Sequence, residues 1–239
     1  IPLASNAQTW RLVRYEAGLG IGTTHSFMDI GSEKDGLRSF SFRGTRPNVF
    51  FDASFLILED LAVQLDLGYI QLAGRDSDAR TRDLSFVTNS FEPVVRVEYS
   101  IIGGGRTFGS TALFNRRGMV NDYNTLNLYA FAGAGGILTK AKVKDINGDE
   151  VVGNPSYDNN LHFGAVFPMG LGLKYQWDSD WAIGLEIGGR FSTSDLLDGY
   201  WNQTASQYKD RYILTNVKAI YKIRNDRRGV PQFSRYRRR

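Results

Sequence analysis

Large apolar side chains alternate with small or charged ones along residues 181–191. Trp181 and Ile183 occupy one side of an extended chain, and Gly184 and Glu186 occupy the other. Successive side chains of a strand point to opposite faces, so this segment predicts a strand with two unlike faces. Small and charged residues suit the narrow inside of a closed barrel, whereas aromatic and branched residues suit contact with lipid.

The same period of two recurs along the chain and predicts eight strands. They cover residues 11–23, 46–57, 61–73, 86–101, 126–138, 163–177, 181–193 and 211–224. For the strand at 126–138 the pattern does not decide which face points into the barrel. Tyr129 and Phe131 lie on the same face as Gly133 and Gly135, so that face carries both large and small residues. The expected fold class is all-β: an eight-stranded antiparallel transmembrane β-barrel of the outer-membrane type.

The connections between these strands alternate in length. Tight turns are expected at 58–60 and 178–180, and long connections at 24–45, 74–85, 139–162 and 194–210. Outer-membrane barrels keep short turns on the periplasmic side and long loops outside. We therefore expect a bacterial outer-membrane location with both termini in the periplasm.

Two connections carry further signals. The connection 102–125 would be periplasmic, yet it is long and has no obvious strands, which makes it the first place to look for a binding role. In the outer connection 139–162, Asn147-Gly148 is a hairpin signal and predicts that this loop extends as a two-stranded ribbon.

The face of each strand that would point into the barrel carries charged residues of both signs. The cations are Arg14, Arg96, Lys174, Arg190, Lys218 and Lys222, and the carboxylates are Glu16, Asp52, Asp66, Glu92, Glu98 and Glu186. Eight strands leave an interior just wide enough for side chains, so these groups should pair with one another. The sequence predicts a filled lumen of ion pairs instead of an aqueous pore.

Composition excludes several alternatives. The 239 residues include no cysteine, so the chain has neither disulfides nor thiolate metal ligands. No apolar run is long enough for a helical membrane span. The net charge of +4 is due to an arginine-rich C-terminal tail, and the rest of the chain is near neutral. Without a nucleic-acid fold signature, that tail favours a protein or membrane-surface partner over nucleic acid.

Signals for catalysis are weak. Glu92 and Glu98 could perform acid–base chemistry, but cations of the same lumen set favour a structural role for both. His25 and His162 are the only histidines and fall in or beside loops far apart in sequence. We therefore expect no catalytic residue, no metal site and no cofactor.

Three segments carry a more specific signal. They are Leu128-Tyr-Ala-Phe-Ala-Gly-Ala-Gly135, the stretch from Trp181 to Asp198, and the strand from Tyr212 to Ile223. These segments resemble PorG-like proteins of the type IX secretion system of Bacteroidetes bacteria. The resemblance implies an outer-membrane barrel without enzymatic activity, which docks to a periplasmic ring of PorK-like lipoprotein and PorN-like protein. It supplies no catalytic residues.

We expect an outer-membrane barrel with a short N-terminal periplasmic segment over residues 1–224, and a basic C-terminal periplasmic tail over 225–239. Aromatic and arginine residues are the usual energetic anchors of interfaces. The predicted partner contacts are Arg106, Phe108, Phe114, Arg116 and Arg117 in the periplasmic connection, and Arg227, Arg228, Phe233 and Tyr236 in the tail.

The leading hypothesis is a barrel that anchors or orients the ring, and two alternative functions remain. A small adhesin-like barrel would bind ligands through its outer loops. A barrel enzyme acting on lipid or peptide would need carboxylates or His162 at the extracellular rim. A soluble lipocalin-like carrier fits less well, because its outside should be polar.

Overall fold

The computed structural model describes the barrel strands and the residues next to them. The described residues are 13–27, 45–58, 60–75, 85–102, 111–115, 118–122, 126–144, 160–177, 180–194, 197, 210–225 and 231.

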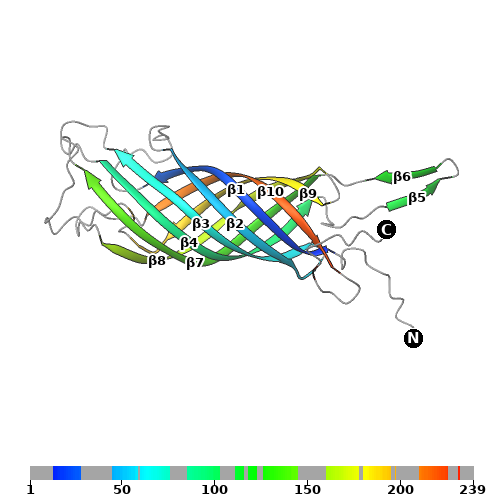
Figure 1. Cartoon of the computed structure of the whole chain (residues 1–239), viewed down its shortest axis with the longest axis horizontal. Coiled ribbons are helices and arrows are strands. Elements are labelled where there is room, and N and C mark those ends of the chain that lie inside the picture. The colour runs from blue at the N-terminus through cyan, green and yellow to red at the C-terminus, as the bar shows by residue number, and fades with distance from the viewer. Residues whose placement is uncertain are drawn as a thin grey trace, which may run out of the picture.

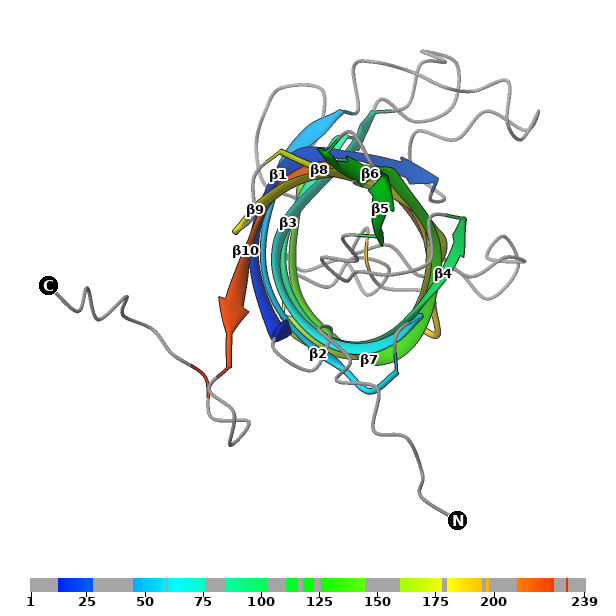
Figure 2. The same ribbon diagram turned by 90° about the vertical axis from the view of Figure 1, so that its right-hand side faces the viewer.

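Eight strands close into an antiparallel barrel, which confirms the predicted fold class (Figures 1 and 2). They are β1 (Val13–Phe27), β2 (Arg46–Leu56), β3 (Leu61–Arg75), β4 (Ser85–Ile102), β7 (Leu126–Lys144), β8 (Leu161–Gln176), β9 (Trp181–Ser192) and β10 (Arg211–Arg224). Each strand pairs with the next in this order, and β10 returns to β1 with Ala17 opposite Tyr221. Among the described residues no helix is long and apolar enough to cross a membrane.

Tight turns join β2 to β3 and β8 to β9, as the sequence predicts. Ile57 N donates to Leu61 O at 3.0 Å, and Trp177 N donates to Trp181 O at 3.1 Å. Strand β7 is longer than predicted and runs to Lys144 instead of residue 138, paired along β4 as far as Ser85. The predicted turn at Asn147-Gly148 lies outside the described residues.

The connection between β4 and β7 contains two strands, contrary to the expectation that it has none. Strand β5 (Thr111–Asn115) pairs antiparallel with β6 (Gly118–Asp122). Asn115 lies opposite Gly118, so only Arg116 and Arg117 link the two strands, and a two-residue link is the commonest hairpin connection. The sequence signal is weak here because two five-residue strands present too few alternations to stand out.

The two ends of the barrel differ. We call one the hairpin end: β1 begins there, β10 ends there, both tight turns lie there, and β5–β6 is inserted there (Figure 1). The opposite end, where the long connections join the strands, is the loop end. Both the first and the last barrel strand therefore have their outer termini at the hairpin end.

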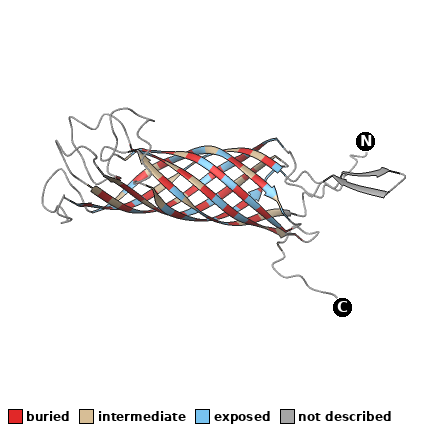
Figure 3. Cartoon of the chain, turned by 90° about the horizontal axis from the view of Figure 1, so that it is seen from above, coloured by how far each residue is buried: buried red, intermediate tan, exposed pale blue. Residues whose placement is uncertain are grey.

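Exposure alternates residue by residue along the strands, as the banding in Figure 3 shows. In β9 every second residue from Trp181 to Phe191 is exposed or half-buried on the outside, and the residues between them are buried inside. The outward residues are mostly large and apolar, and exposed Tyr99, Tyr175, Trp177 and Trp181 gather at the hairpin end. At the hairpin end the rings of Trp181 and Tyr221 lie 5.0 Å apart, as in an interfacial aromatic belt. An apolar outside with a polar inside is the arrangement of a membrane barrel and the reverse of a soluble carrier.

Glycines face aromatic side chains across the strands inside the barrel. Phe50 lies opposite Gly68, and Tyr129 lies opposite Gly172. A Cβ atom at Gly172 would come within 2.7 Å of Tyr129 Cε2, so no larger residue fits without moving the ring. At these two positions glycine is needed because the ring of the facing residue lies over the backbone of the neighbouring strand.

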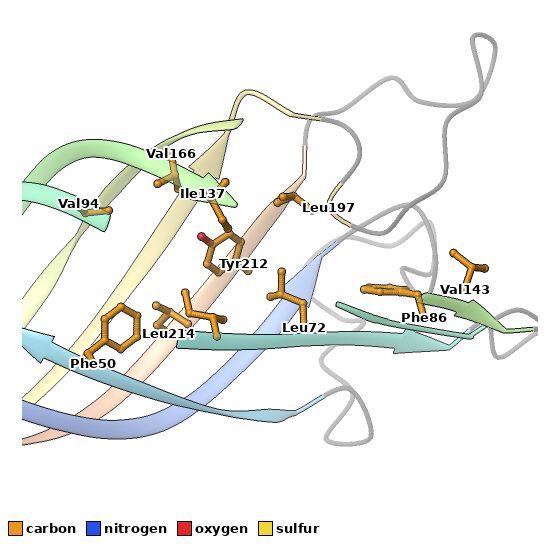
Figure 4. Close-up of a cluster of buried hydrophobic side chains, with 11 residues drawn as sticks. Phe50, Leu72, Phe86, Val94, Ile137, Val143, Val166, Leu197, Tyr212 and Leu214 are labelled. Carbon is orange, nitrogen blue, oxygen red and sulfur yellow. The ribbon is translucent and has the colours of Figure 1, made fainter. Parts of the chain in front are cut away.

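An apolar cluster fills the lumen at the loop end (Figure 4). Its members are Phe50, Ile70, Leu72, Phe86, Val94, Ile137, Val143, Val166, Leu197, Tyr212 and Leu214. Leu197 belongs to the connection between β9 and β10, not to a strand, and its side chain is fully buried. Asp210 Oδ2 accepts a hydrogen bond from Leu197 N at 3.0 Å, and Thr88 Oγ1 donates one to Leu197 O at 2.7 Å. Both backbone groups of this residue are thus fastened to the barrel.

Candidate functional site

The middle of the lumen holds the charged residues that the sequence assigned to it. Every predicted member is buried except Arg14, which is only half-buried because it lies at the open hairpin end of β1. The group fills the barrel below the apolar cluster, which confirms a filled lumen.

Arg96 is the centre of the network. Its side chain, which projects from β4, is fully buried and reaches carboxylates on two other strands. Nη2 lies 2.7 Å from Glu186 Oε1 on β9, and Nε lies 3.0 Å from Asp66 Oδ2 on β3. A third carboxylate, that of Glu98, lies 3.4 Å from Nη2. A planar guanidinium with five donors is suited to serving several carboxylates at once.

Two lysines extend the network across the lumen. Lys218 Nζ on β10 lies 3.1 Å from Asp52 Oδ1 and 3.0 Å from Glu186 Oε2, so Glu186 joins it to Arg96. Towards the hairpin end, Lys174 Nζ on β8 lies 3.2 Å from Glu16 Oε2 and 3.1 Å from Glu98 Oε2. These contacts tie strands from all sides of the barrel to one another.

A smaller group of charges lies beside the apolar cluster, towards the loop end from Arg96 on β4. Arg190 Nε contacts Glu92 Oε1 at 3.0 Å, and the hydroxyl of Tyr212 donates a hydrogen bond to Glu92 Oε2. Tyr212 also belongs to the apolar cluster, so its side chain contacts both the charged residues and the apolar residues of the lumen.

Tyr129 and Phe131 point into the lumen, which resolves the ambiguous facing of β7. The Tyr129 hydroxyl donates to Glu186 Oε1 at 2.6 Å. The Arg96 guanidinium carbon lies 4.4 Å from the centre of the Phe131 ring, and Lys174 Nζ lies 4.8 Å from that of Tyr129. Both rings thus make cation–π contacts with the charged side chains of the lumen. The signal in the sequence was Asn127, a polar residue that shares their parity.

The paired charges leave little for acid–base chemistry. Each of the six lumen carboxylates that the structure describes lies within 3.4 Å of a lysine or arginine nitrogen. Glu92 and Glu98, the candidate acid–base residues, bind different cations and are fully buried. A carboxylate that is buried and already bound to a cation cannot meet a substrate, so the arrangement supports a structural role.

The two histidines lie on different strands near the loop end. His25 Nδ1 on β1 lies 3.1 Å from Thr45 Oγ1. His162 on β8 is opposite Thr139 of β7. Neither strand is a neighbour of the other in the barrel, so the described geometry does not bring the histidines into one site.

Most of the predicted partner contacts lie outside the described residues. This holds for Arg106, Phe108, Arg116, Arg117, Arg227, Arg228, Phe233 and Tyr236. Phe114 has a described backbone, which lies in β5. The boundary between barrel and tail at 224/225 coincides with the end of β10, but the tail beyond it is not described apart from Asn225 and Pro231, which form an isolated bridge.

Comparison with known proteins gives distant structural likenesses. No protein-family model matches the chain, and no curated protein matches it. A major outer membrane protein of Thermus thermophilus is 10% identical, with 87% of this chain and 99% of that chain covered and a TM-score of 0.45. The outer membrane protein AlkL is 12% identical, with 94% and 95% covered and a TM-score of 0.44. The N-terminal β-barrel domain of Pseudomonas aeruginosa OprF is 11% identical, with 88% and 98% covered and a TM-score of 0.43. At such identities the likenesses do not extend to function, and the chain's own barrel closure, filled lumen and apolar exterior make it an outer-membrane-type barrel.

Proposed function

We propose that this chain is a non-enzymatic outer-membrane component of a type IX protein secretion system. In this proposal it anchors or orients a periplasmic ring of PorK-like and PorN-like proteins. The resemblance of the segments 128–135, 181–198 and 212–223 to PorG-like proteins suggests the system. The partner surface would be the hairpin end, which is then periplasmic.

The observation that supports this best is the β5–β6 hairpin. It is inserted between β4 and β7 at the end where the tight turns also lie (Figure 1). Its strands are joined by Arg116 and Arg117, two of the predicted contacts, and Phe114 belongs to β5. A hairpin that leaves the barrel adds nothing to barrel closure, so a role in contacting another protein accounts for its presence. The filled lumen supports the non-enzymatic part, because its charges are already paired.

The test compares variants at the two ends of the barrel. In the hairpin-end variant, a short Gly-Ser linker replaces residues 103–124 and residues 225–239 are deleted. In the matched control, the same linker replaces residues 145–159 at the loop end. Each barrel is crosslinked and recovered from the native envelope, and folding is checked by its faster migration in unheated detergent gels.

We expect the hairpin-end variant to fold and to lose the ring proteins, while the loop-end variant retains them. Unchanged recovery of the ring by the hairpin-end variant would defeat the assignment of the contacts. Loss of surface or host ligands from the loop-end variant, with no ring protein recovered by the wild type, would favour the adhesin-like alternative instead.

A further inference from the structure

The β5–β6 hairpin is a sheet of two strands, separate from the barrel wall. In the described part of the chain β5 pairs only with β6, and neither strand belongs to the closed ladder of the barrel. Figure 1 shows the pair beyond the hairpin end, pointing away from the barrel. A two-stranded hairpin is marginally stable in water by itself, and a third strand is one way to complete it.

The pairing register indicates which backbone groups the hairpin leaves for another strand. Asn115 and Gly118 flank the two-residue link, and residues in that place exchange the hydrogen bonds that close the turn. Bonded and non-bonded pairs alternate along an antiparallel ladder, so Ala112 and Asn121, which are opposite each other, form a non-bonded pair. The N–H and C=O groups of Ala112 therefore point out from the free edge of β5, and those of Asn121 point out from the free edge of β6.

The two free edges differ in sequence. Strand β5 reads Thr-Ala-Leu-Phe-Asn and has neither a charged residue nor a proline, whereas β6 begins with Gly118 and ends with Asp122. Natural proteins protect edge strands from further pairing with charged side chains, proline or bulges. The edge of β5 carries no such residue, so it is the better template for an added strand.

We propose that the free edge of β5 binds an extended segment of the periplasmic partner by β-strand addition. The backbone groups of Ala112 and Phe114, two residues apart on this edge, would pair with the added strand. In this mode of recognition main-chain hydrogen bonds supply the affinity. The inference rests on the proposed function, because it takes a ring subunit as the partner.

A second copy of the chain fits this edge less well than a different protein. Two barrels in one membrane point their hairpins in the same direction, so β5 of one copy would pair in parallel with β5 of the other. Parallel pairing would bring the Arg116-Arg117 links of both copies to the same end of the joint sheet. Like charges placed together in this way oppose association.

The test uses proline at the two residues that face each other across the hairpin. Ala112→Pro removes the outward N–H group of β5, and Asn121→Pro removes that of β6, so both disturb the hairpin at the same place. Ala112→Val keeps the N–H group of β5 and is the second control. Each full-length barrel is purified from the native envelope in mild detergent, and the ring protein recovered with it is quantified. Heat-dependent gel migration checks that each barrel is folded.

We expect Ala112→Pro to lower the recovery of ring protein by about tenfold, the effect of losing one or two backbone hydrogen bonds. Asn121→Pro and Ala112→Val should recover as much as the wild type. Full recovery by Ala112→Pro, or equal losses in the two proline variants, would overturn strand addition at β5 and leave the proposed function standing. A wild type that recovers no ring protein would overturn the proposed function itself.

A photo-crosslinker identifies what lies beside the edge. p-Benzoylphenylalanine replaces Phe114, because residues directly opposite on paired strands lie about 4.5–5.5 Å apart. An intermolecular crosslink to a ring subunit, lost when Ala112→Pro is added, is the expected result. An intermolecular crosslink to a second copy of this chain would overturn the assignment of the partner.

Discussion

Arg96 links more carboxylates of the described lumen than Lys174, Lys218 or Arg190 does. It lies within 3.4 Å of Glu186, Asp66 and Glu98, whereas Arg190 contacts Glu92. Without the guanidinium, Glu186 would keep its contact with Lys218 and Glu98 its contact with Lys174, but Asp66 would lose the cation that its described ion pair supplies. Removing one member of a buried ion pair destabilises a protein by much more than the intact pair stabilises it, because a buried charge is left without its partner.

We therefore predict that Arg96→Met destabilises the folded barrel by about 3–5 kcal/mol. The unfolding free energy is measured by urea titration in detergent micelles, followed by tryptophan fluorescence. Arg96→Lys serves as the control, since it keeps the charge but loses the planar fork, and it should cost less than Arg96→Met. A loss below about 1 kcal/mol in Arg96→Met would show that the network does not depend on this residue.

The pairing of glycine with an aromatic ring acts between neighbouring strands. Gly172 of β8 lies under the ring of Tyr129 of β7, and the hydroxyl of that ring bonds Glu186. A methyl group at Gly172 must displace the ring and weaken that hydrogen bond. We predict that Gly172→Ala costs about 1–3 kcal/mol, the usual range for overpacking, in the same unfolding assay.

Gly184 of β9 offers a matched control. It also faces the lumen, but a Cβ atom there would have Ile220 Cδ1 as its nearest neighbour at 3.3 Å. Gly184→Ala should therefore change stability little. Combining Gly172→Ala with Tyr129→Leu should cost less than the sum of the two single changes, because the displaced ring is gone. Strict additivity would contradict the proposed contact between glycine and ring.

At the level of elements, much of the barrel could be predicted from the sequence. The period-two alternation predicted eight barrel strands, because residues that face lipid must be apolar whereas their neighbours in the sequence face a lumen of packed charges. The facing of β7 could not be decided by apolarity, since Tyr129 and Phe131 are large and apolar yet lie inside. The β5–β6 hairpin was missed because short strands that do not belong to the barrel wall follow no lipid-imposed pattern.

At the level of the whole molecule, which charge meets which could not be predicted. Arg96 and Glu186 are 90 residues apart, and Lys174 and Glu16 are 158 residues apart. Their meeting depends on the closure and stagger of the barrel, which no local segment encodes. The alternation identified which charged residues point into the lumen, but it did not predict which of them form ion pairs with one another. Leu197 shows the same limit, because its burial depends on contacts with distant residues such as Thr88 of β4.

The lumen has two barriers in series. The apolar cluster with Leu197 fills the loop end, and the ion-pair network around Arg96 fills the middle. An ion that crosses the barrel would have to pass an apolar region and then a region where each carboxylate already has a cation, and each passage costs free energy of desolvation.

We predict that the wild-type barrel gives no conductance steps in planar lipid bilayers. Leu197→Ala should stay silent as well, because opening one barrier leaves the other in place. A porin added to the same bilayer is the positive control, and insertion of the barrel is checked by its heat-dependent gel migration. Conductance in Leu197→Ala alone would mean that the charged middle is permeable and that Leu197 by itself closes the barrel, and conductance in the wild type would contradict a filled lumen altogether.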